Sequence, residues 1–394
     1  MNFEEYFKGS TLFKDESKLF PEYVPSYLPF REEQIKRLAI FFKGILELDN
    51  FSFYRAICHG PAGTGKTAVA KFFGKLISDE ARKRGLKLYF VHVNCHLERT
   101  YFMVVSKIAE HLIPGIPKRG FSPKQYLTWI LDYLEEENAK LMLCLDEADY
   151  IIRNDPELLY DLTRIPELGI NKIRMNLLLI LRNISNLYSL DESILSTLQR
   201  NINQFNPYTY FEIKEIIKER VQEAFVANVV DENVIEMIAM KSGIDKGGKG
   251  DARFALELLW RAGKIAEIEN SNKVKIEHLR KAMSEIYPGL SIEIFETLLD
   301  EEKLILLSIC KALKEENNSY TNIKRVREHY ELICERLKRI PKKYTQFWSY
   351  IQSLKNKNLI NVTVVNERRG RRSYISIDVP LDTLESKLLE NVKV

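Results

Sequence analysis

The chain has 394 residues, and its 59 lysines and arginines nearly balance its 55 aspartates and glutamates, which leaves a net charge of +4. This length is enough for two or three domains of about 100–200 residues, each with its own core. Hydrophobic residues make up 45% of the chain and charged residues 29%, and these values argue against a disordered or fibrous protein. The total charge alone does not indicate a nucleic-acid-binding protein.

No apolar run approaches the length of about 18–20 residues that a bilayer-spanning helix needs. The strongest runs, residues 141–145 and 177–181, have the length of a strand, and the acidic, aromatic N-terminus does not have the pattern of a secretory signal. The five cysteines are widely spread and contain no C-x-x-C pair, which favours reduced, buried thiols. We therefore expect a soluble, intracellular protein without a membrane partner.

Three side chains near residue 95 are chemically able to bind a metal ion, namely His92, Cys95 and His96. They follow a strand-like run at residues 86–93, and the sequence offers no second cluster of ligands. Ordinary packing is the favoured interpretation of these side chains.

From residue 53 to residue 183, short apolar runs alternate with amphipathic patterns. The runs at 53–59, 86–93, 141–145 and 176–181 predict strands, and the pattern at 67–84 predicts a helix that ends at Gly85. Ser122 followed by Pro123 predicts the N-terminus of a further helix. Strands joined by helical crossovers indicate an α/β fold with a parallel sheet that is covered on both faces.

Beyond Pro207 the sequence predicts helices alone as far as about residue 286, with an interruption at the glycine-rich loop 246–250. A second break at 287–290 precedes further helices and then two strands, at 359–365 and 373–378, around a basic turn at 366–372. We therefore predict three domains, over residues 1–205, 206–287 and 288–394.

Residues 60–67, Gly-Pro-Ala-Gly-Thr-Gly-Lys-Thr, match the phosphate-binding pattern G-x-x-x-x-G-K-[ST] between a predicted strand and a predicted helix. Backbone N–H groups and the positive end of the helix attract phosphate oxygens in such a loop. Lys66 is expected to reach the β- and γ-phosphates, and Thr67 is expected to bind Mg²⁺. The pattern predicts an ATP or ADP site lined by Pro61, Ala62, Gly63, Thr64, Gly65, Lys66 and Thr67.

Two adjacent carboxylates, Asp146 and Glu147, follow the apolar run at 141–145. In phosphoryl-transfer sites of this kind the first carboxylate holds the Mg²⁺ shell, and the second can polarise the attacking water. Asn183, at the end of the run at 176–181, is able to orient that water, although alone it is equally a loop asparagine. Arg253, at the start of a predicted helix, is able to reach the phosphates, whereas most such arginines pair with a neighbour such as Asp251 or Glu257.

The C-terminal region contains a strongly basic segment. Residues 336–372 hold eleven lysines or arginines and one acid, Glu367. The local charge of this segment is therefore +10, and the rest of the chain carries −6. A basic segment of this kind is typical of a surface that binds nucleic-acid phosphates. A solvent-exposed basic face without a ligand is the alternative.

Within this segment, a helix capped by Thr345 is predicted to bury Phe347, Tyr350, Ile351 and Leu354. The opposite face then carries polar side chains able to meet base edges or phosphates, with Arg368, Arg369, Arg371 and Arg372 at the tip of the following hairpin suited to a minor groove. The predicted polar face consists of Gln346, Trp348, Ser349, Gln352, Ser353 and Lys355.

Six ordered segments of the sequence resemble the archaeal origin-recognition and helicase-loading initiators, relatives of the eukaryotic origin recognition complex subunits and of the cell-division-control loader. The similarity covers nearly the whole chain. It lies in Val-Pro-Ser-Tyr-Leu-Pro-Phe-Arg-Glu-Glu-Gln-Ile at 24–35, the phosphate-binding loop, Asp-Glu-Ala-Asp at 146–149, Phe-Asn-Pro-Tyr-Thr at 205–209, Gly-Asp-Ala-Arg-Phe-Ala-Leu at 250–256, and the C-terminal helices and basic hairpin.

The resemblance implies an AAA+ P-loop ATPase domain, a helical lid and a C-terminal winged-helix domain. It implies that Asn183 and Arg253 act as sensors 1 and 2, and that Tyr208 and Arg220 contact nucleotide, although the residues alone would identify Tyr208 as a packing aromatic. Lys118 and Arg119 fall where such initiators carry a DNA-contacting insertion, with a plain solvated loop as the alternative.

One segment departs from the family. The family commonly shows Leu-Asp-Pro-Arg after sensor 1, and this chain reads Leu-Asp-Glu-Ser at 190–193, so Ser193 replaces an arginine that acts on a neighbour's ATP. Arg200 lies nearby, and the sequence does not show whether it substitutes.

The resemblance implies an archaeal, cytoplasmic, nucleoid-associated initiator with slow, switch-like ATP hydrolysis that uses ATP or ADP and Mg²⁺. Its implied partners are duplex origin DNA, the replicative minichromosome maintenance helicase and paralogous initiator subunits. The alternatives are an ATP- or ADP-bound DNA-binding regulator with little hydrolysis, and a signalling ATPase whose winged helix binds protein.

Overall fold

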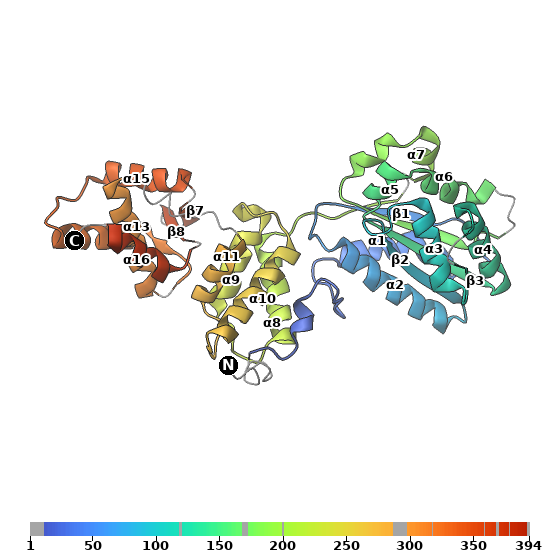
Figure 1. Cartoon of the computed structure of the whole chain (residues 1–394), viewed down its shortest axis with the longest axis horizontal. Coiled ribbons are helices and arrows are strands. Elements are labelled where there is room, and N and C mark those ends of the chain that lie inside the picture. The colour runs from blue at the N-terminus through green and yellow to red at the C-terminus, as the bar shows by residue number, and fades with distance from the viewer. Residues whose placement is uncertain are drawn as a thin grey trace. The chain divides into compact units, whose positions relative to one another are not determined.

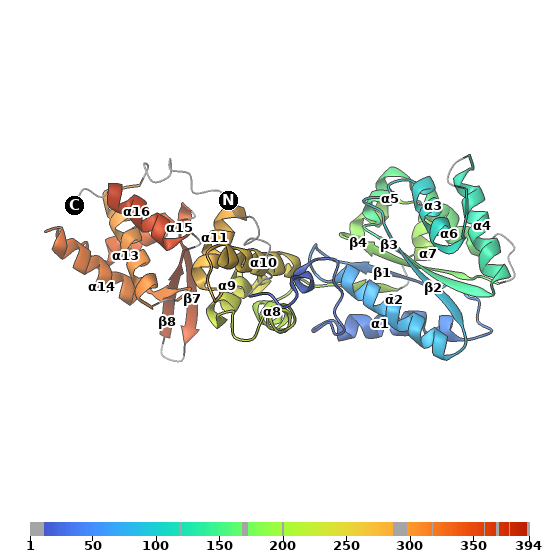
Figure 2. The same ribbon diagram turned by 60° about the horizontal axis from the view of Figure 1, so that its bottom comes forward.

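The structure is a computed structural model, and its described residues form two compact units (Figures 1 and 2). The first, which we call the α/β unit, consists of the described residues within 21–213 and 242–253, and the second, the helical unit, consists of the described residues within 1–20, 214–241 and 254–394. The described residues are 12–117, 120–167, 172–198, 201–286, 298–316, 318–357, 359–367, 370–377 and 379–391.

Several residues singled out in the sequence are not described. Lys118, Arg119, Arg200, Arg368 and Arg369 lie outside the described residues, and the side chain of Arg371 is likewise not described. Their roles stay predictions from the sequence.

A parallel five-stranded sheet forms the centre of the α/β unit, with the strand order β2-β3-β4-β1-β5. Every residue of β3 and β4 is buried, which explains why these strands read as continuous apolar runs. The predicted parallel sheet is confirmed, and only the short edge strand β5 had no apolar run to predict it. The strands are β1 (Arg55–His59), β2 (Lys87–Asn94), β3 (Ala139–Asp146), β4 (Met175–Leu181) and β5 (Ile202–Gln204).

Alternate residues of β3 point to the two faces of the sheet, and each face has its own apolar core. Leu141, Leu143 and Leu145 pack in one core, which contains residues of α3 to α7, whereas Met142 and Cys144 pack in the other, which contains residues of α1 and α2. Figure 2 shows these two layers of helices. They are α1 (Glu32–Phe42), α2 (Lys66–Lys83), α3 (Tyr101–Leu112), α4 (Pro123–Glu136), α5 (Asp149–Asn154), α6 (Glu157–Arg164) and α7 (Glu192–Leu198).

The predicted helix ends are confirmed where the sequence carries a specific signal. Gly85 follows the end of α2 with a φ of +72°, a left-handed conformation that glycine adopts without a Cβ penalty. Ser122 caps α4 through a complete capping box with Gln125, and Pro123 is the first helical residue.

The first half of the helical unit contains α8 (Tyr210–Ala224), α9 (Glu232–Ser242), α10 (Ala252–Ile268) and α11 (Ile276–Ile286), of which α8, α9 and α10 each begin or end in residues of the α/β unit. The N-terminal segment packs on α8: the backbone N–H of Lys14 donates to the carbonyl of Ala224, with N and O 2.8 Å apart. The rings of Phe13 and Phe225 lie 4.5 Å apart between centroids.

The C-terminal part folds as helices around a small antiparallel sheet of order β6-β8-β7. The side chains of Phe347, Ile351 and Leu354 are fully buried in its core, as the sequence predicts. Its elements are α13 (Asp300–Glu316), β6 (Thr321–Asn322), α14 (Ile323–Arg336), α15 (Tyr344–Asn356), β7 (Asn361–Glu367), β8 (Gly370–Ser376) and α16 (Leu381–Asn391).

Two details predicted for α15 are wrong. Thr345 does not cap the helix, because α15 begins at Tyr344 and follows Lys343, whose backbone is extended and whose side chain makes no capping bond. Ser353 and Trp348 do not belong wholly to the polar face: Ser353 donates to the buried carboxylate of Glu302, with the two oxygens 2.6 Å apart, and the Trp348 ring packs against the core.

A fully buried arginine on α11 ties this helix to the C-terminal part of the same unit. Arg280 is only 1% exposed, and its guanidinium donates to the backbone carbonyls of Ile377 at 3.3 Å and Asn318 at 3.1 Å. It also pairs with Glu277, whose carboxylate accepts the backbone N–H of Leu381. The bonds of Arg280 therefore join segments about 40 and 100 residues away in sequence.

We predict that Arg280→Ala destabilises the helical unit by about 2–4 kcal/mol, because the substitution leaves Glu277 without its cation and two carbonyls without their donor. The measurement is the unfolding midpoint in urea. Arg261→Ala is the matched control. Arg261 forms a partly exposed ion pair with Glu257 on the same helix, and such a pair contributes at most about 0.5 kcal/mol to stability. Equal midpoints for the two variants would contradict the prediction.

Candidate nucleotide and DNA sites

In the phosphate-binding loop between β1 and α2, two glycines adopt left-handed backbone conformations. Gly63 and Gly65 have φ values of +71° and +88°, and a Cβ at Gly65 would lie 2.8 Å from the hydroxyl oxygen of Tyr208. The ammonium of Lys66 donates to the carbonyls of Gly60 and Pro61 at 2.7 and 2.6 Å, which holds it across the loop. The loop thus brings a cation and the N-terminus of α2 to one point, a phosphate-binding arrangement.

Lys66 is buried, and its position has electrostatic consequences. Burial lowers the pKa of the Lys66 ammonium, while the charges of Asp146 and Asp149 act in the opposite direction. A desolvated cation in this position gains strongly from an anion, because Coulomb attraction to a phosphate offsets the solvation that burial removes.

Oxygen ligands suitable for a divalent cation meet at the end of β3. The hydroxyl of Thr67 donates to Oδ2 of Asp146 at 2.7 Å, and Nε2 of His92 lies 3.0 Å from the same oxygen. Asp146 is 3% exposed, and its Oδ1 accepts the backbone N–H of Glu147 at 2.8 Å. A hydroxyl and a carboxylate are the ligands that Mg²⁺ prefers, so Thr67 and Asp146 fit the predicted metal. His92 is a residue that the sequence did not assign to this site.

The donors around Asp146 decide its ionisation. Burial raises the pKa of Asp146, but the bonds from His92, Thr67 and the backbone of Glu147 outweigh burial and hold the pKa below its ordinary value. Asp146 therefore stays ionised throughout the neutral range. The pKa of Asp146 is lower in the folded protein than in the unfolded chain. Ionised Asp146 therefore stabilises the fold at pH values above its unfolded pKa, and this stabilisation is lost as the pH falls through its folded pKa.

The second predicted carboxylate, Glu147, has its own partner. Glu147 adopts a left-handed φ of +51°, and its Oε1 lies 2.6 Å from Nη2 of Arg182. This bond raises the pKa of Arg182. Arg182 directly follows β4 and is a second residue that the sequence analysis did not assign to this site. A charged residue directly after a buried strand is a sequence signal that could have identified it.

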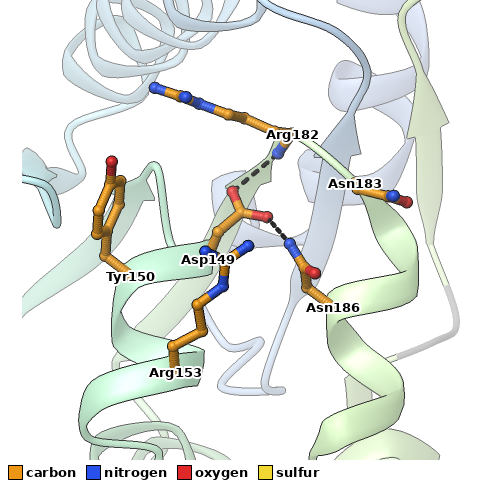
Figure 3. Close-up of a pocket in the computed structure, with 6 residues that line it drawn as sticks. All are labelled: Asp149, Tyr150, Arg153, Arg182, Asn183 and Asn186. Atoms are coloured by element: carbon orange, nitrogen blue, oxygen red, sulfur yellow. Dashed lines mark hydrogen bonds between the residues drawn. The ribbon is translucent and has the colours of Figure 1, made fainter.

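Asp149 fixes the chain that carries Arg182. Its Oδ2 accepts the backbone N–H of Arg182 at 2.8 Å, and its Oδ1 accepts the side-chain N–H of Asn186 at 2.5 Å (Figure 3). These groups border a pocket of about 180 Å³ lined by Asp149, Tyr150, Arg153, Arg182, Asn183 and Asn186.

The predicted sensor Asn183 is one of the residues that line this pocket, next to Arg182 and at the carboxyl end of β4. Its side-chain oxygen accepts the backbone N–H of Ser185 at 3.0 Å, and in Figure 3 the side chain points away from Asp149. The structure thus places Asn183 at the same sheet edge as Asp146 and Glu147.

Tyr208 is almost wholly buried, and Arg31 covers its ring. The guanidinium carbon of Arg31 lies 3.8 Å from the ring centroid of Tyr208, and Nε of Arg31 donates to the carbonyl of Thr64 at 2.9 Å. Burial raises the pKa of Tyr208 to about 12. Arg31 thus links the phosphate-binding loop to Tyr208, although the three residues are far apart in sequence. Local sequence patterns do not predict such a contact, and the sequence analysis gave Arg31 no role.

Arg253 lies at the first turn of α10, beside the loop. The backbone N–H of Ala252 donates to the carbonyl of Gly63 at 3.1 Å, which brings this helix start onto the phosphate-binding loop, and the Arg253 side chain is exposed. Glu257, considered as its partner, pairs with Arg261 instead. Arg220 belongs to the helical unit, where it pairs with Glu223 at 2.6 Å.

The candidate DNA residues of α15 divide by exposure. Gln346, Ser349 and Lys355 are exposed, and Gln352 is half-buried. The hydroxyl of Ser349 donates to the carbonyl of Gln346 at 2.8 Å. On β8, the side chain of Arg372 is exposed. Among the described ranges, no helix combines the length and the apolar composition that crossing a bilayer requires.

Comparison with known protein families finds a match for three segments of the chain. Residues 54–190 match the AAA domain family, residues 214–284 the Cdc6 AAA+ ATPase-type lid domain, and residues 293–387 the CDC6 C-terminal winged helix domain. The chain is 39% identical to the ORC1-type DNA replication protein 2 of Sulfurisphaera tokodaii, over 98% of this chain and 94% of the relative.

Solved structures give the same assignment. The crystal structure of Cdc6p from Pyrobaculum aerophilum is 29% identical, covers 97% of this chain and 99% of its own, and has a TM-score of 0.82. The Aeropyrum pernix ORC1 protein, solved in complex with DNA, is 28% identical over 98% of both chains, with a TM-score of 0.64.

Fold and matches define an AAA+ P-loop protein of the α/β class with a Cdc6-type lid and a C-terminal winged helix, as the sequence predicts. The chain belongs to the family of ORC1-type DNA replication proteins.

We predict that His92→Ala lowers the affinity for ATP about tenfold when Mg²⁺ is present and leaves it unchanged in EDTA, because His92 orients the carboxylate that would hold the metal. Titration with a fluorescent ATP analogue measures both affinities. His96→Ala is the control, since the His96 ring packs on Tyr150 instead. An equal loss with and without Mg²⁺ would show that His92 supports the fold rather than the metal ligand.

Proposed function

We propose that the chain is an ATP-dependent DNA replication initiator that binds duplex origin DNA and helps recruit or load the replicative minichromosome maintenance helicase. The observation that carries the proposal is a phosphate-binding loop whose Thr67 bonds Asp146, present in the same chain as a winged helix that carries a local charge of +10. The proposal includes the predicted domain limits of 1–205, 206–287 and 288–394.

The nucleotide chemistry follows from the residues at the sheet edge. The loop residues 61–67 bind the phosphates of ATP or ADP, and Tyr208, Arg220 and Arg253 complete the binding site. Mg²⁺, held by Thr67 and Asp146, would neutralise phosphate charge. Glu147 accepts the proton of the attacking water, and Asn183 orients that water. In this proposal, ATP hydrolysis is slow and acts as a conformational switch.

The proposed DNA contacts rest on exposure for the α15 residues and on charge in the sequence for the hairpin arginines and for residues 118 and 119. Gln346, Ser349, Gln352 and Lys355 on α15 face the major groove, where amide and hydroxyl groups discriminate base edges. The hairpin arginines Arg368, Arg369, Arg371 and Arg372 enter the minor groove, and Lys118 and Arg119 contact phosphates. The Aeropyrum pernix relative was solved with DNA, which supports this part of the proposal. Such a protein acts in the cytoplasm on the nucleoid, together with paralogous initiator subunits.

A second candidate function is a DNA-binding regulator that holds ATP or ADP and hydrolyses little. Two observations favour it: Ser193 stands where the family commonly carries an arginine, and the carboxylate of Glu147 is engaged by Arg182. A protein that retains ADP through purification and shows negligible turnover with DNA and paralogues present would support this second function.

We predict that Glu147→Gln lowers ATP turnover at least about 100-fold while ATP binding is retained, because the amide cannot accept a proton. Lys66→Ala, in contrast, abolishes binding itself. Phosphate release and equilibrium binding of labelled ATP measure the two effects. Lys71→Ala, on the same helix outside the loop, serves as the control, and unchanged turnover in both Glu147→Gln and Lys66→Ala would refute the proposed site.

We predict that changing Arg368, Arg369, Arg371 and Arg372 to alanine weakens duplex binding and lowers the slope of log affinity against log salt by about one for each DNA phosphate that the variant no longer neutralises. Fluorescence anisotropy over a salt series measures both quantities. A variant with Lys75, Arg82, Lys83 and Arg84 changed to alanine removes the same charge from an exposed part of α2 and its end. Equal reductions in the two variants would show that total charge, rather than the hairpin, determines binding.

A further inference from the structure

Arg182 stands at an unusual place in the candidate site. It follows directly after β4, whose seven residues are all buried, and it precedes the predicted sensor Asn183. A strand that is buried on both faces can present a charged side chain only where it leaves the sheet. Arg182 therefore stands at the sheet edge where Asp146 and Glu147 also lie.

The backbone at Arg182 is fixed from two sides. Its N–H donates to the buried carboxylate of Asp149 at 2.8 Å, and the backbone N–H of Ala148 donates to the carbonyl of Ile180 at 3.0 Å. These bonds tie the turn after β3 to the end of β4. The Arg182 side chain thus starts from a defined position beside Glu147, and its reach toward that residue does not depend on a flexible loop.

The guanidinium of Arg182 engages the carboxylate that the proposed reaction needs. Nη2 lies 2.6 Å from Oε1 of Glu147, a short, charge-assisted bond. This bond occupies Oε1 and holds the carboxylate toward Arg182, so Glu147 is not free to turn toward an attacking water elsewhere in the site while the bond lasts. The orientation of the Glu147 carboxylate therefore depends on Arg182.

This bond is able to break without disturbing the core. The side chains of Arg182 and Glu147 are 53% and 26% exposed, and Arg182 lines the 180 Å³ pocket beside it. Rotation of the guanidinium away from Glu147 leaves no buried cavity and no unpaired buried charge. Ion pairs at this exposure contribute little to stability, so competition for either partner displaces them readily.

We propose that Arg182 is a positioning residue that restrains ATP hydrolysis by holding the carboxylate of Glu147, and that turnover rises when this bond is broken. The inference rests on the proposed function, in which Glu147 accepts the proton of the attacking water. It gives the slow, switch-like hydrolysis a cause within this chain that is independent of Ser193 and of any neighbouring subunit.

The test compares ATP turnover and ATP binding of the full chain with those of Arg182→Ala. We expect kcat to rise about two- to fivefold, the factor that corresponds to releasing a partly exposed ion pair, with KM unchanged. Arg182→Lys, which keeps a cation in reach of Glu147, should stay close to the parent rate. Arg153→Ala is the matched control, because Arg153 is an exposed arginine that lines the same pocket.

A double variant identifies the route of the extra turnover. Arg182→Ala combined with Glu147→Gln should be as inactive as Glu147→Gln alone, and activity in the double variant would overturn the inference. Unchanged or lower kcat in Arg182→Ala with ATP binding intact would also overturn it, since Arg182 would then be inert or would itself stabilise the reacting phosphate. Absence of ATP binding by the parent chain would instead overturn the proposed function, and this inference with it.

Discussion

The parallel pairing of β4 between β3 and β1 is the constraint on which the site depends. In this register Leu145 lies beside Leu179, and His59 lies beside Leu181, so the three strands leave the sheet at the same edge. The phosphate-binding loop, Asp146 and Asn183 therefore meet although they are far apart in sequence, as expected at the carboxyl ends of a parallel sheet. Every residue of β4 is buried, and the strand packs in an apolar core on each of its two faces.

Three carboxylates within four residues have three different tasks at this edge. Asp146 accepts from Thr67 and His92, Glu147 pairs with Arg182, and Asp149 binds the backbone of Arg182. Burial separates them: Asp146 and Asp149 are 3% and 5% exposed, whereas the left-handed turn at Glu147 carries its side chain to a more open place. An acidic cluster that looks uniform in sequence is therefore divided by local backbone geometry.

The sequence predicted what local patterns encode. Strands β1 to β4, the loop and its lysine, the start of α4 at Ser122 and Pro123, and the buried face of α15 each follow from periodicity or from a specific short motif. Long-range contacts were not predictable in this way. Arg31 reaches Thr64, and Arg280 reaches Ile377, and no pattern near either arginine indicates its partner. Ser353 was misassigned because periodicity gives a face, whereas its bond depends on Glu302, 51 residues away.

The basic C-terminal segment shows how charge placement and local pairing act together. Lys357 is one of the eleven cations of this segment. Its ammonium donates to the buried carboxylate of Glu302 at 2.6 Å, so this cation neutralises a buried charge instead of adding to the basic surface. Arg339 and Lys342, before α15, lie 3.9 Å from Asp300 and Glu301, the outer limit of an ion pair. Such loose, partly exposed pairs barely reduce the outward positive potential. The segment therefore keeps most of its charge for an anionic partner, while the exposed Gln346 and Ser349 add groups that distinguish one base edge from another.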